Sequence, residues 1–331
     1  MQEMIDDEEY LTARSNQSTV GTSLFVFLIS TVCFCLFLSA VAKELMPENL
    51  YKTPLVLILI SLICQYVIAL PISFSIMRNV PVAKASQFTM TTKQFIGFFA
   101  VSYPIIFVGN YIGTFLSYLL SDGYSLNRVE QLALSSGILQ NILFFVIIAP
   151  IVEEFIFRKL ILDRLRMYGE KRAIVFSALA FALFHMNLFQ FFYTFGVGLL
   201  FGYMYVRTSR LRYSILLHMI INLQGSVIPI LIMRQLVNAN GKMININKLA
   251  KSELSQIPLN ILIIGFYGMF MLGMLIFGIV ILARCKHYLV FFEAPNEISG
   301  SRGTKALYGS ASVISFIVIG SIFTILMLFA Q

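Results

Sequence analysis

Charged side chains are scarce in this 331-residue sequence, since only 12% of the residues are Asp, Glu, Lys or Arg whereas 58% are hydrophobic. A soluble globular domain carries about 25% charged residues, so this chain has too little polar surface to cover a water-soluble particle. The same composition excludes intrinsic disorder, which requires low hydrophobicity and high charge. Together with a mean hydropathy of +0.84, the scarcity of charge predicts an integral membrane protein.

Cysteine and histidine are also rare, with four and three copies. The cysteines lie inside apolar stretches or at the edge of one, where a thiol behaves as a small hydrophobic group, and their positions indicate no disulfide framework. Long basic stretches are missing as well. The net charge of +8 therefore does not indicate a nucleic-acid-binding protein, because no segment is able to form a basic groove.

Long apolar stretches dominate what remains. A helix needs about 20 mostly apolar residues to cross a bilayer, and the stretch 173–206 is too long for one crossing but fits two short helices that turn near residues 186–190. The sequence therefore predicts an all-α, polytopic membrane helix bundle of eight or nine transmembrane helices. The candidates are residues 22–42, 54–77, 94–120, 137–157, two within 173–206, 213–233, 257–283 and 308–330. Residues 1–21 are polar and acidic and are expected to form a solvated cytoplasmic tail on a single bundle spanning 22–331.

The lysines and arginines orient this bundle. Most of the 24 Lys and Arg residues fall in the N-terminal tail and in every second loop, and this side is expected to be cytoplasmic by the positive-inside rule. The N-terminus and the Glu153 end of its helix are then both expected on the cytoplasmic side. The lysines and arginines expected on the other side are Lys43, Lys52, Arg128, Arg234, Lys242, Lys248 and Lys251.

A few polar side chains lie inside the apolar stretches, where burial is costly and usually marks a functional site. Glu153 and Glu154 close one predicted span, His185 lies in another, and His218 and Asn222 share a third. Residues four apart lie on one helix face. His218 and Asn222 are therefore predicted to point the same way.

The same spacing separates two further pairs. Glu154 and Arg158 are expected to form an ion pair, which leaves the Glu153 carboxylate free, and Phe181 is expected to pack beside His185. Each element alone has an ordinary structural interpretation, such as an interfacial charge pair, a packed histidine or an interhelical hydrogen bond. Three such elements on three successive parts of the bundle favour a functional site.

This set of side chains is suited to hydrolysis. A carboxylate near a neutral histidine is able to take a proton from water, and the Asn222 amide and the His218 ring N–H are donors for an oxyanion. Two histidines and one glutamate, here His185, His218 and Glu153, also match the ligand set of a catalytic zinc site. The residues leave both versions open, so the cofactor requirement is either none or zinc.

Three ordered motifs carry a family resemblance. Residues 153–158 read Glu-Glu-Phe-Ile-Phe-Arg and resemble Glu-Glu-x-x-x-Arg, residues 181–185 resemble Phe-x-x-x-His, and residues 218–222 resemble His-x-x-x-Asn. In this order they resemble the CPBP family of intramembrane proteases. That family includes the type II CAAX prenyl endopeptidases and bacterial members linked to bacteriocin processing and self-immunity. The resemblance covers about residues 137–225, the expected catalytic core.

The resemblance implies a role for each residue. Glu153 would activate water with help from His185, His218 and Asn222 would hold the oxyanion or serve a metal, and Glu154, Arg158 and Phe181 would be structural. The expected substrate is a membrane-anchored peptide or protein, and the expected location is the plasma membrane of a bacterium. Two other classes of function compete with it: a non-enzymatic immunity protein that binds a toxin or its receptor, and a transporter that uses Glu and His as a proton relay.

Overall fold

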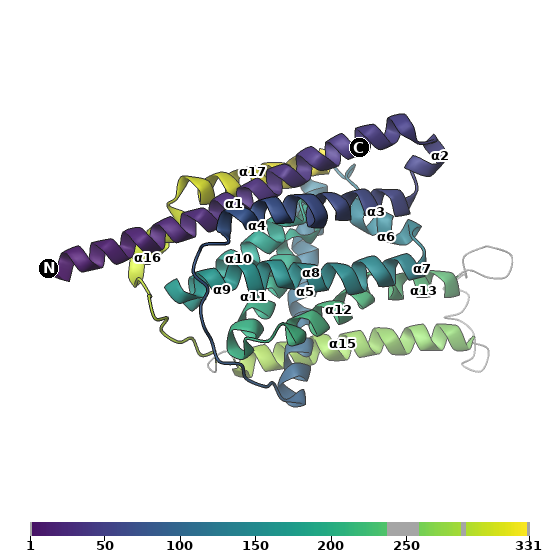
Figure 1. Cartoon of the computed structure of the whole chain (residues 1–331). Helices are drawn as coiled ribbons and strands as arrows, with labels where there is room; N and C mark the ends of the chain where they lie inside the picture. Colours follow the sequence, from purple (N-terminus) through teal and green to yellow (C-terminus); the bar gives the residue numbers. More distant parts are fainter. Residues whose placement is uncertain (1, 237–257, 286–288, 330–331) are drawn as a thin grey trace.

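The computed structural model describes residues 2–236, 258–285 and 289–329, and in these ranges the chain is helical and contains no strand. The described residues include eight helices long and apolar enough to cross a membrane, which confirms the predicted polytopic all-α bundle (Figure 1). These are α1 (Gln2–Leu45), the segment Pro54–Met77, α5 (Thr92–Leu120), the segment Ile138–Tyr168, α11 (Leu188–Thr208), the segment Leu211–Gln235, α15 (Leu259–Cys285) and α17 (Ala311–Phe329).

Three of these spans are composed of several helical pieces that follow one another without a loop. The segment Pro54–Met77 contains α3 (Pro54–Leu62), the π-helical η1 (Ile63–Ala69) and α4 (Leu70–Met77). The segment Ile138–Tyr168 contains α7 (Ile138–Gln140), η2 (Asn141–Ile148), α8 (Ala149–Glu154), η3 (Phe155–Leu162), α9 (Asp163–Leu165) and η4 (Arg166–Tyr168). The segment Leu211–Gln235 contains α12 (Leu211–Ser226) and α13 (Ile228–Gln235). Shorter helices α2 (Glu48–Tyr51), α6 (Arg128–Ser135), α10 (Glu170–Phe184) and α16 (Gly300–Tyr308) complete the described structure.

The apolar stretch 173–206 forms two helices, as predicted. Helix α10 has 15 residues, and at 1.5 Å per residue it is about 22 Å long. It is therefore shorter than the hydrocarbon core of a bilayer, which is about 30 Å thick. The chain turns at Met186, whose φ of 45° lies in the left-handed region. The side chain of Asn187 then caps α11 by accepting a hydrogen bond from the Phe189 N–H at 3.1 Å.

The helix that carries the two glutamates is longer than predicted. The sequence placed its end near residue 157, but the segment is helical from Ile138 to Tyr168. Glu153 therefore lies in the middle of a span, and the expectation that it lies at a cytoplasmic helix end is wrong. The charges beyond residue 157 do not end the helix because they pair with one another: the Asp163 carboxylate lies 2.9 Å from both Lys159 Nζ and Arg166 Nη2.

The segment expected to be a solvated tail is the first part of α1. Ala13, Gln17 and Val20 are buried, and the Asn16 amide donates a hydrogen bond of 2.7 Å to the Tyr168 hydroxyl. Ser18 and Ser312 lie 3.0 Å apart through their hydroxyl oxygens. One face of the N-terminal half of α1 is therefore buried, and it contacts η4 and α17 through these hydrogen bonds.

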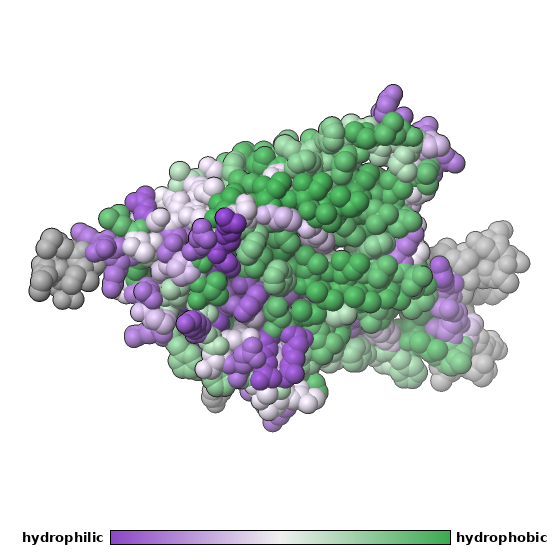
Figure 2. Space-filling model, viewed as in Figure 1, coloured by the Kyte–Doolittle hydropathy of each residue, from purple (hydrophilic) through white to green (hydrophobic). Residues whose placement is uncertain are grey.

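Lysines and arginines gather at one end of the bundle, and tertiary contacts join the chain segments there. The Ala83 N–H donates to the Asp163 carbonyl at 2.8 Å, and the Phe88 N–H donates to the Thr208 carbonyl at 2.9 Å. Arg207 and Glu170 form an ion pair in the same region. Figure 2 shows hydrophilic residues at this end and an apolar surface over the middle of the molecule. We call it the basic end; its Lys and Arg residues include Lys84, Arg164, Arg166, Lys171, Arg172, Arg207, Arg210 and Arg212.

Two glycines let α5 and α11 approach closely. A Cβ atom on Gly109 would lie 2.5 Å from the Tyr193 Cα atom, and one on Gly113 would lie 2.6 Å from the Phe189 carbonyl oxygen. Glycines four residues apart are a recognised device for close helix packing in membranes. In contrast, α15 is mostly surrounded by space or lipid: Gly278 is its buried residue, and a Cβ there would overlap the carbonyl oxygen of Ala100 on α5.

We expect Gly113→Ala to destabilise the protein by about 1–3 kcal/mol, the usual cost of overpacking, because its new methyl group would meet backbone atoms that cannot move away. Gly97→Ala on the same helix is the matched control, since nothing lies within 4 Å of a Cβ at that position. Thermal unfolding of the purified variants in detergent measures both. Equal melting temperatures for Gly113→Ala and wild type would contradict the close approach.

Candidate active site

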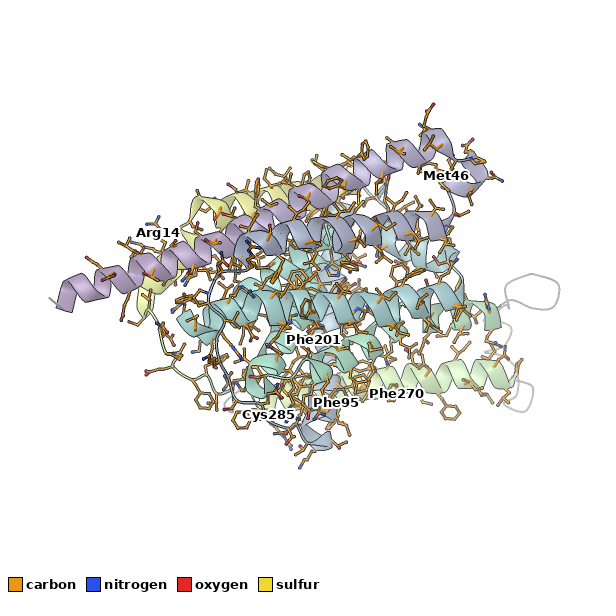
Figure 3. All side chains as sticks on the ribbon, viewed as in Figure 1. Arg14, Met46, Phe95, Phe201, Phe270 and Cys285 are labelled. Atoms are coloured by element: carbon orange, nitrogen blue, oxygen red, sulfur yellow. The ribbon has the colours of Figure 1, made fainter. Side chains whose placement is uncertain are left out.

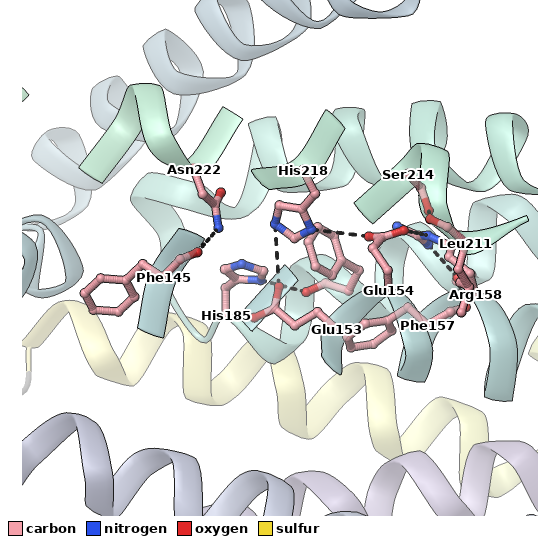
Figure 4. Close-up of polar contacts among 12 residues, drawn as sticks. Phe145, Glu153, Glu154, Phe157, Arg158, His185, Leu211, Ser214, His218 and Asn222 are labelled. Carbon is pink, nitrogen blue, oxygen red and sulfur yellow. Dashed lines mark hydrogen bonds and ion pairs between the residues drawn. The ribbon is translucent and has the colours of Figure 1, made fainter. Parts of the chain in front are cut away.

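The four predicted catalytic side chains come together. Glu153 on α8, His185 after α10, and His218 and Asn222 on α12 all line one cavity of about 1210 Å³. Figure 4 shows the labelled side chains of Glu153, His185 and His218 directed toward one another. The ordered motifs of the sequence therefore meet in space within the bundle.

A buried ion pair lies directly beside the cavity. Arg158 Nε lies 3.1 Å from Glu154 Oε2, and both side chains are fully buried. The guanidinium also donates through Nη1 to the Ser177 hydroxyl at 2.8 Å. That hydroxyl in turn donates to the Phe157 carbonyl at 2.8 Å. This chain of charge-assisted hydrogen bonds links η3 to α10 and offsets part of the cost of burying two charges.

His218 lies between the two glutamates. Its Nε2 atom is 3.7 Å from Glu153 Oε2, and its Nδ1 atom is 3.4 Å from Glu154 Oε1. These last two atoms face each other, and neither has a hydrogen-bond partner elsewhere among the described residues. Because a carboxylate only accepts hydrogen bonds, a proton on Nδ1 is held there by Glu154, and Nε2 is directed at Glu153.

Aromatic rings fix the imidazole of His218 from two sides. The Phe181 ring meets it edge-on with centroids 5.7 Å apart, and the Phe201 ring lies 5.1 Å away at a tilt of 30°. Both rings also face the Arg158 guanidinium, at 5.5 and 5.9 Å. Figure 3 shows Phe201 in the interior of the bundle, whereas Arg14 and Cys285 lie at its periphery. The rings thus hold the imidazole and the guanidinium in a dry environment, where cation–π attraction is strong.

His185 has a fixed orientation as well. Its Nδ1 atom lies 2.8 Å from the Phe181 carbonyl oxygen, and since a carbonyl only accepts, Nδ1 carries the proton of the neutral ring. Its Nε2 atom is then free to accept a proton. Phe181 packs edge-on against this ring at 4.8 Å, as the spacing of four residues predicted.

Asn222 is tied to the helix of the glutamates. Its side-chain N–H donates to the Phe145 carbonyl at 2.8 Å. Pro150 lies five residues after Phe145 and has no N–H. In a π-helical turn that N–H would donate to the Phe145 carbonyl, so this carbonyl lacks its usual donor. Asn222 therefore satisfies a carbonyl of η2 and has a second side-chain N–H left for another acceptor.

The zinc ligand set predicted as an alternative does not assemble here. Among the residues that the structure describes, no three His, Cys, Asp or Glu side chains are grouped so as to hold a metal ion. Glu153, His185 and His218 line the same cavity. His185 Nδ1 is engaged by a backbone carbonyl and His218 Nδ1 faces Glu154, so a metal ion would have to bind the Nε2 atoms.

Two residues of the site were not predicted from the sequence. The Tyr66 hydroxyl lies 3.5 Å from Glu153 Oε1 and reaches it from η1, and Ser177 on α10 completes the buried ion pair. Tyr66 lies outside the three motifs, and nothing in its local sequence indicates a contact 87 residues away. For Ser177 a weak signal existed, since it lies on the predicted helix four residues before Phe181.

The comparisons with known proteins concern the part of the chain that carries the three motifs. Residues 135–224, which contain all three motifs, match the family model of type II CAAX prenyl endopeptidases of the Rce1-like group. The chain is also 38% identical over 104 residues to the membrane-embedded CAAX protease MroQ of Staphylococcus aureus (strain USA300). That alignment covers 29% of this chain and 42% of MroQ, so it spans less than half of the relative. No solved structure matches the chain.

The eight apolar helices describe a multi-pass membrane protein, and the segment with the three motifs, which meet in one cavity, is similar to a CAAX endopeptidase domain. Over this part of the sequence the chain is similar to membrane-embedded CAAX proteases.

Removing one partner of the buried ion pair should destabilise the fold. We expect Arg158→Met to cost about 3–5 kcal/mol, because it leaves the Glu154 carboxylate buried beside no cation. Lys52→Met is the matched control: it breaks an ion pair with the same spacing, to Glu48, whose side chains are 67% and 76% exposed. Exposed pairs contribute little. Thermal unfolding in detergent compares the two, and equal losses would refute a structural role for Arg158.

Proposed function

We propose that this protein is an intramembrane endopeptidase that cleaves a membrane-associated peptide or protein with water activated by Glu153. One observation carries the proposal: the Glu153 carboxylate lies 3.7 Å from His218 Nε2 in a cavity inside the bundle. The Glu153 side chain is 21% exposed whereas Glu154 is fully buried, so of the two glutamates Glu153 is the one that water reaches. The match of residues 135–224 to the Rce1-like endopeptidase family model supports the same reaction.

The first step of this mechanism is the attack of water on the peptide carbonyl. The gap of 3.7 Å is longer than a direct hydrogen bond, and a water molecule that bridges Glu153 and His218 fits it. Glu153 takes one proton from this water as its oxygen forms a bond to the carbonyl carbon. Tyr66 holds the other carboxylate oxygen and so orients the base.

The tetrahedral intermediate then needs donors for its oxyanion. The second N–H of Asn222 is suited to this role. Glu153 returns its proton to the leaving nitrogen as the carbon–nitrogen bond breaks, so the base ends in its starting form. In this arrangement His218, held by Glu154, is the partner of Glu153, whereas the family resemblance implied His185 in that role.

The competing proposal is a membrane protein that acts by binding, as an immunity protein would. It requires the cavity but not the carboxylate of Glu153. The sequence contains no internal repeat, so it does not favour a transporter with a proton relay. The substrate proposed here is a membrane-anchored peptide or protein in the plasma membrane of a bacterium, for which a peptide pheromone or bacteriocin precursor is the fitting chemical class.

Glu153→Gln should lower cleavage by roughly 10²–10⁴-fold, the usual contribution of a general base, while the protein stays folded. A strain lacking the gene is complemented with wild type, Glu153→Gln or the exposed-site control Glu44→Gln at matched membrane levels. Mass spectrometry of membrane and secreted peptides should then find a precursor that accumulates with Glu153→Gln alone. If all three variants restore the same peptide profile and phenotype, the protein acts by binding.

Chelation separates the two chemical versions of the site. Because the described residues form no metal-binding group, we expect cleavage of the identified peptide by purified protein to continue after exhaustive treatment with chelators. Elemental analysis of the treated sample verifies that metal has been removed. Loss of cleavage on chelation, with recovery on addition of zinc alone, would overturn the metal-free mechanism and leave the protease proposal standing.

A further inference from the structure

We propose that Asn141, which belongs to none of the three motifs, positions the Asn222 carboxamide for the cleavage reaction. The proposal rests on the endopeptidase function proposed above, in which Asn222 donates to the oxyanion. The Asn141 side chain is fully buried, and its hydrogen-bond partners Ala133 and Ser226 line the cavity in its place. Asn141 therefore acts through its neighbours rather than on the substrate.

Asn141 joins the first turn of η2 to the last turn of α12. Its Nδ2 atom donates to the Ser226 carbonyl at 3.0 Å and to the Ala133 carbonyl of α6 at 2.8 Å. One turn further along the same two helices the direction is reversed, since Asn222 of α12 donates to the Phe145 carbonyl of η2 at 2.8 Å (Figure 4). Each helix thus offers one carboxamide and one carbonyl to the other.

Two hydrogen bonds one turn apart restrict a movement that one bond leaves free. A single bond acts as a pivot, about which two helices are able to rotate and tilt. Asn222 and Ser226 are four residues apart and lie on one face of α12, about 5–6 Å from each other. Because each bond holds its donor and acceptor within about 2.7–3.2 Å, the two together fix the rotation of α12 against η2. The direction of the Asn222 side chain is fixed with it.

The carboxamide of Asn141 is the group that this position requires. A side-chain amide offers two N–H donors on one uncharged nitrogen, whereas a hydroxyl donates to one carbonyl only. The Oδ1 atom of Asn141 is buried and makes no hydrogen bond to any described residue. A buried acceptor without a partner is destabilising, so packing alone favours leucine, which has the same branching. The two donors are what asparagine adds here.

The end of α12 needs such a contact. A helix leaves its last four carbonyls without donors from its own backbone, and α12 ends at Ser226. Pro229, at the start of α13, brings no N–H to this junction. The Ser226 hydroxyl closes the last turn by donating to the Asn222 carbonyl at 2.7 Å. Among the described residues, the other hydrogen bond between this turn and η2 is that of Asn222 itself, so Asn141 supplies the support that does not depend on the reacting group.

The second bond of Asn141 holds α6. This helix has eight residues, too few to be stable alone. Asn127, its N-terminal cap, accepts a hydrogen bond at 3.0 Å from Asn187, which lies two residues after His185. Its last turn is bound by Asn141 through the Ala133 carbonyl. Figure 1 shows α6, α7 and α13 together at the end of the bundle opposite the basic end. Asn141 therefore connects the turn beside His185 with the contact between η2 and α12.

Steady-state kinetics of the purified full chain in detergent test the positioning role. The substrate is a quenched fluorescent peptide that spans the cut found with the Glu153→Gln strain. We expect Asn141→Leu to lower kcat by about 10²-fold with KM unchanged, because misplacing a reacting group by about 1 Å has an effect of this size. Asn16→Leu is the matched control and should keep the kcat of wild type. It removes an interhelical hydrogen bond to Tyr168, and neither residue lines the cavity.

A double-mutant cycle shows whether Asn141 acts through Asn222. Asn222→Ala alone should lower kcat by roughly 10²–10³-fold, the effect of removing one oxyanion donor. We expect Asn141→Leu to lower kcat no further in that background, since changes within one unit are not additive. Full multiplication of the two losses, or a wild-type kcat for Asn141→Leu, overturns the proposal. If Asn141→Leu does not fold, Asn141→Ser keeps one donor and should show a smaller loss with the same non-additivity.

Hydrogen exchange of the Asn222 carboxamide gives a readout that requires no cleavage. In protein labelled with ¹⁵N-asparagine, the NMR signal of this side chain is the one missing from Asn222→Ala. Its N–H groups should exchange slowly with water in wild type and Asn16→Leu, because one of them is bonded to Phe145, and faster in Asn141→Leu. Equal exchange in all three overturns the proposal. A chain without peptidase activity would still show the difference, so failure of the proposed function and failure of the positioning role are separate results.

Discussion

The cost of placing ions in hydrocarbon governs the arrangement of this protein. Glu154 and Arg158 are buried in a span and persist as charges only because each has the other, with Ser177 and the surrounding rings completing their contacts. Once Glu154 is committed to Arg158, its second oxygen is directed at His218, and His218 is directed at Glu153. The placement of Glu153 and His218 therefore depends on one ion pair that cannot be moved without leaving a bare charge in the membrane.

The space at the site and the close packing beside it have different origins. Helix α10 is too short to cross a bilayer, and Asn187, which follows it, donates a hydrogen bond to Asn127. The bundle is tightly packed where α5 and α11 meet at glycines. The proposed reaction needs both features, since water must reach Glu153 while the helices that position it stay rigid.

The sequence predicted a large part of this. The scarcity of charge predicted the bundle, and helical spacing predicted that Glu154 pairs with Arg158 and that Phe181 packs on His185, both of which the structure contains. The division of residues 173–206 followed from length alone. The assembly of the three motifs in one cavity followed from their order and the family resemblance rather than from any local pattern.

Other features required three-dimensional information. Charged residues near position 160 resemble a loop, and only their mutual pairing around Asp163 shows that the helix continues. The first residues of α1 are polar in composition, yet Gln17 is buried against the bundle. The choice between His185 and His218 as partner of Glu153 depends on ångström-scale contacts, and Tyr66 reaches the site from a helix with no motif. Each of these is a long-range contact, which spacing along one helix cannot reveal.

Helix α15 contrasts with the packed site, because few of its side chains are buried. In its 27 residues Gly278 is the buried one, set against the backbone of α5. Its other positions mainly have to be apolar and helical, since lipid accepts many shapes of side chain. Related sequences are therefore expected to diverge freely along α15 while keeping a small residue at position 278, and alignments anchored on overall similarity will lose this helix first.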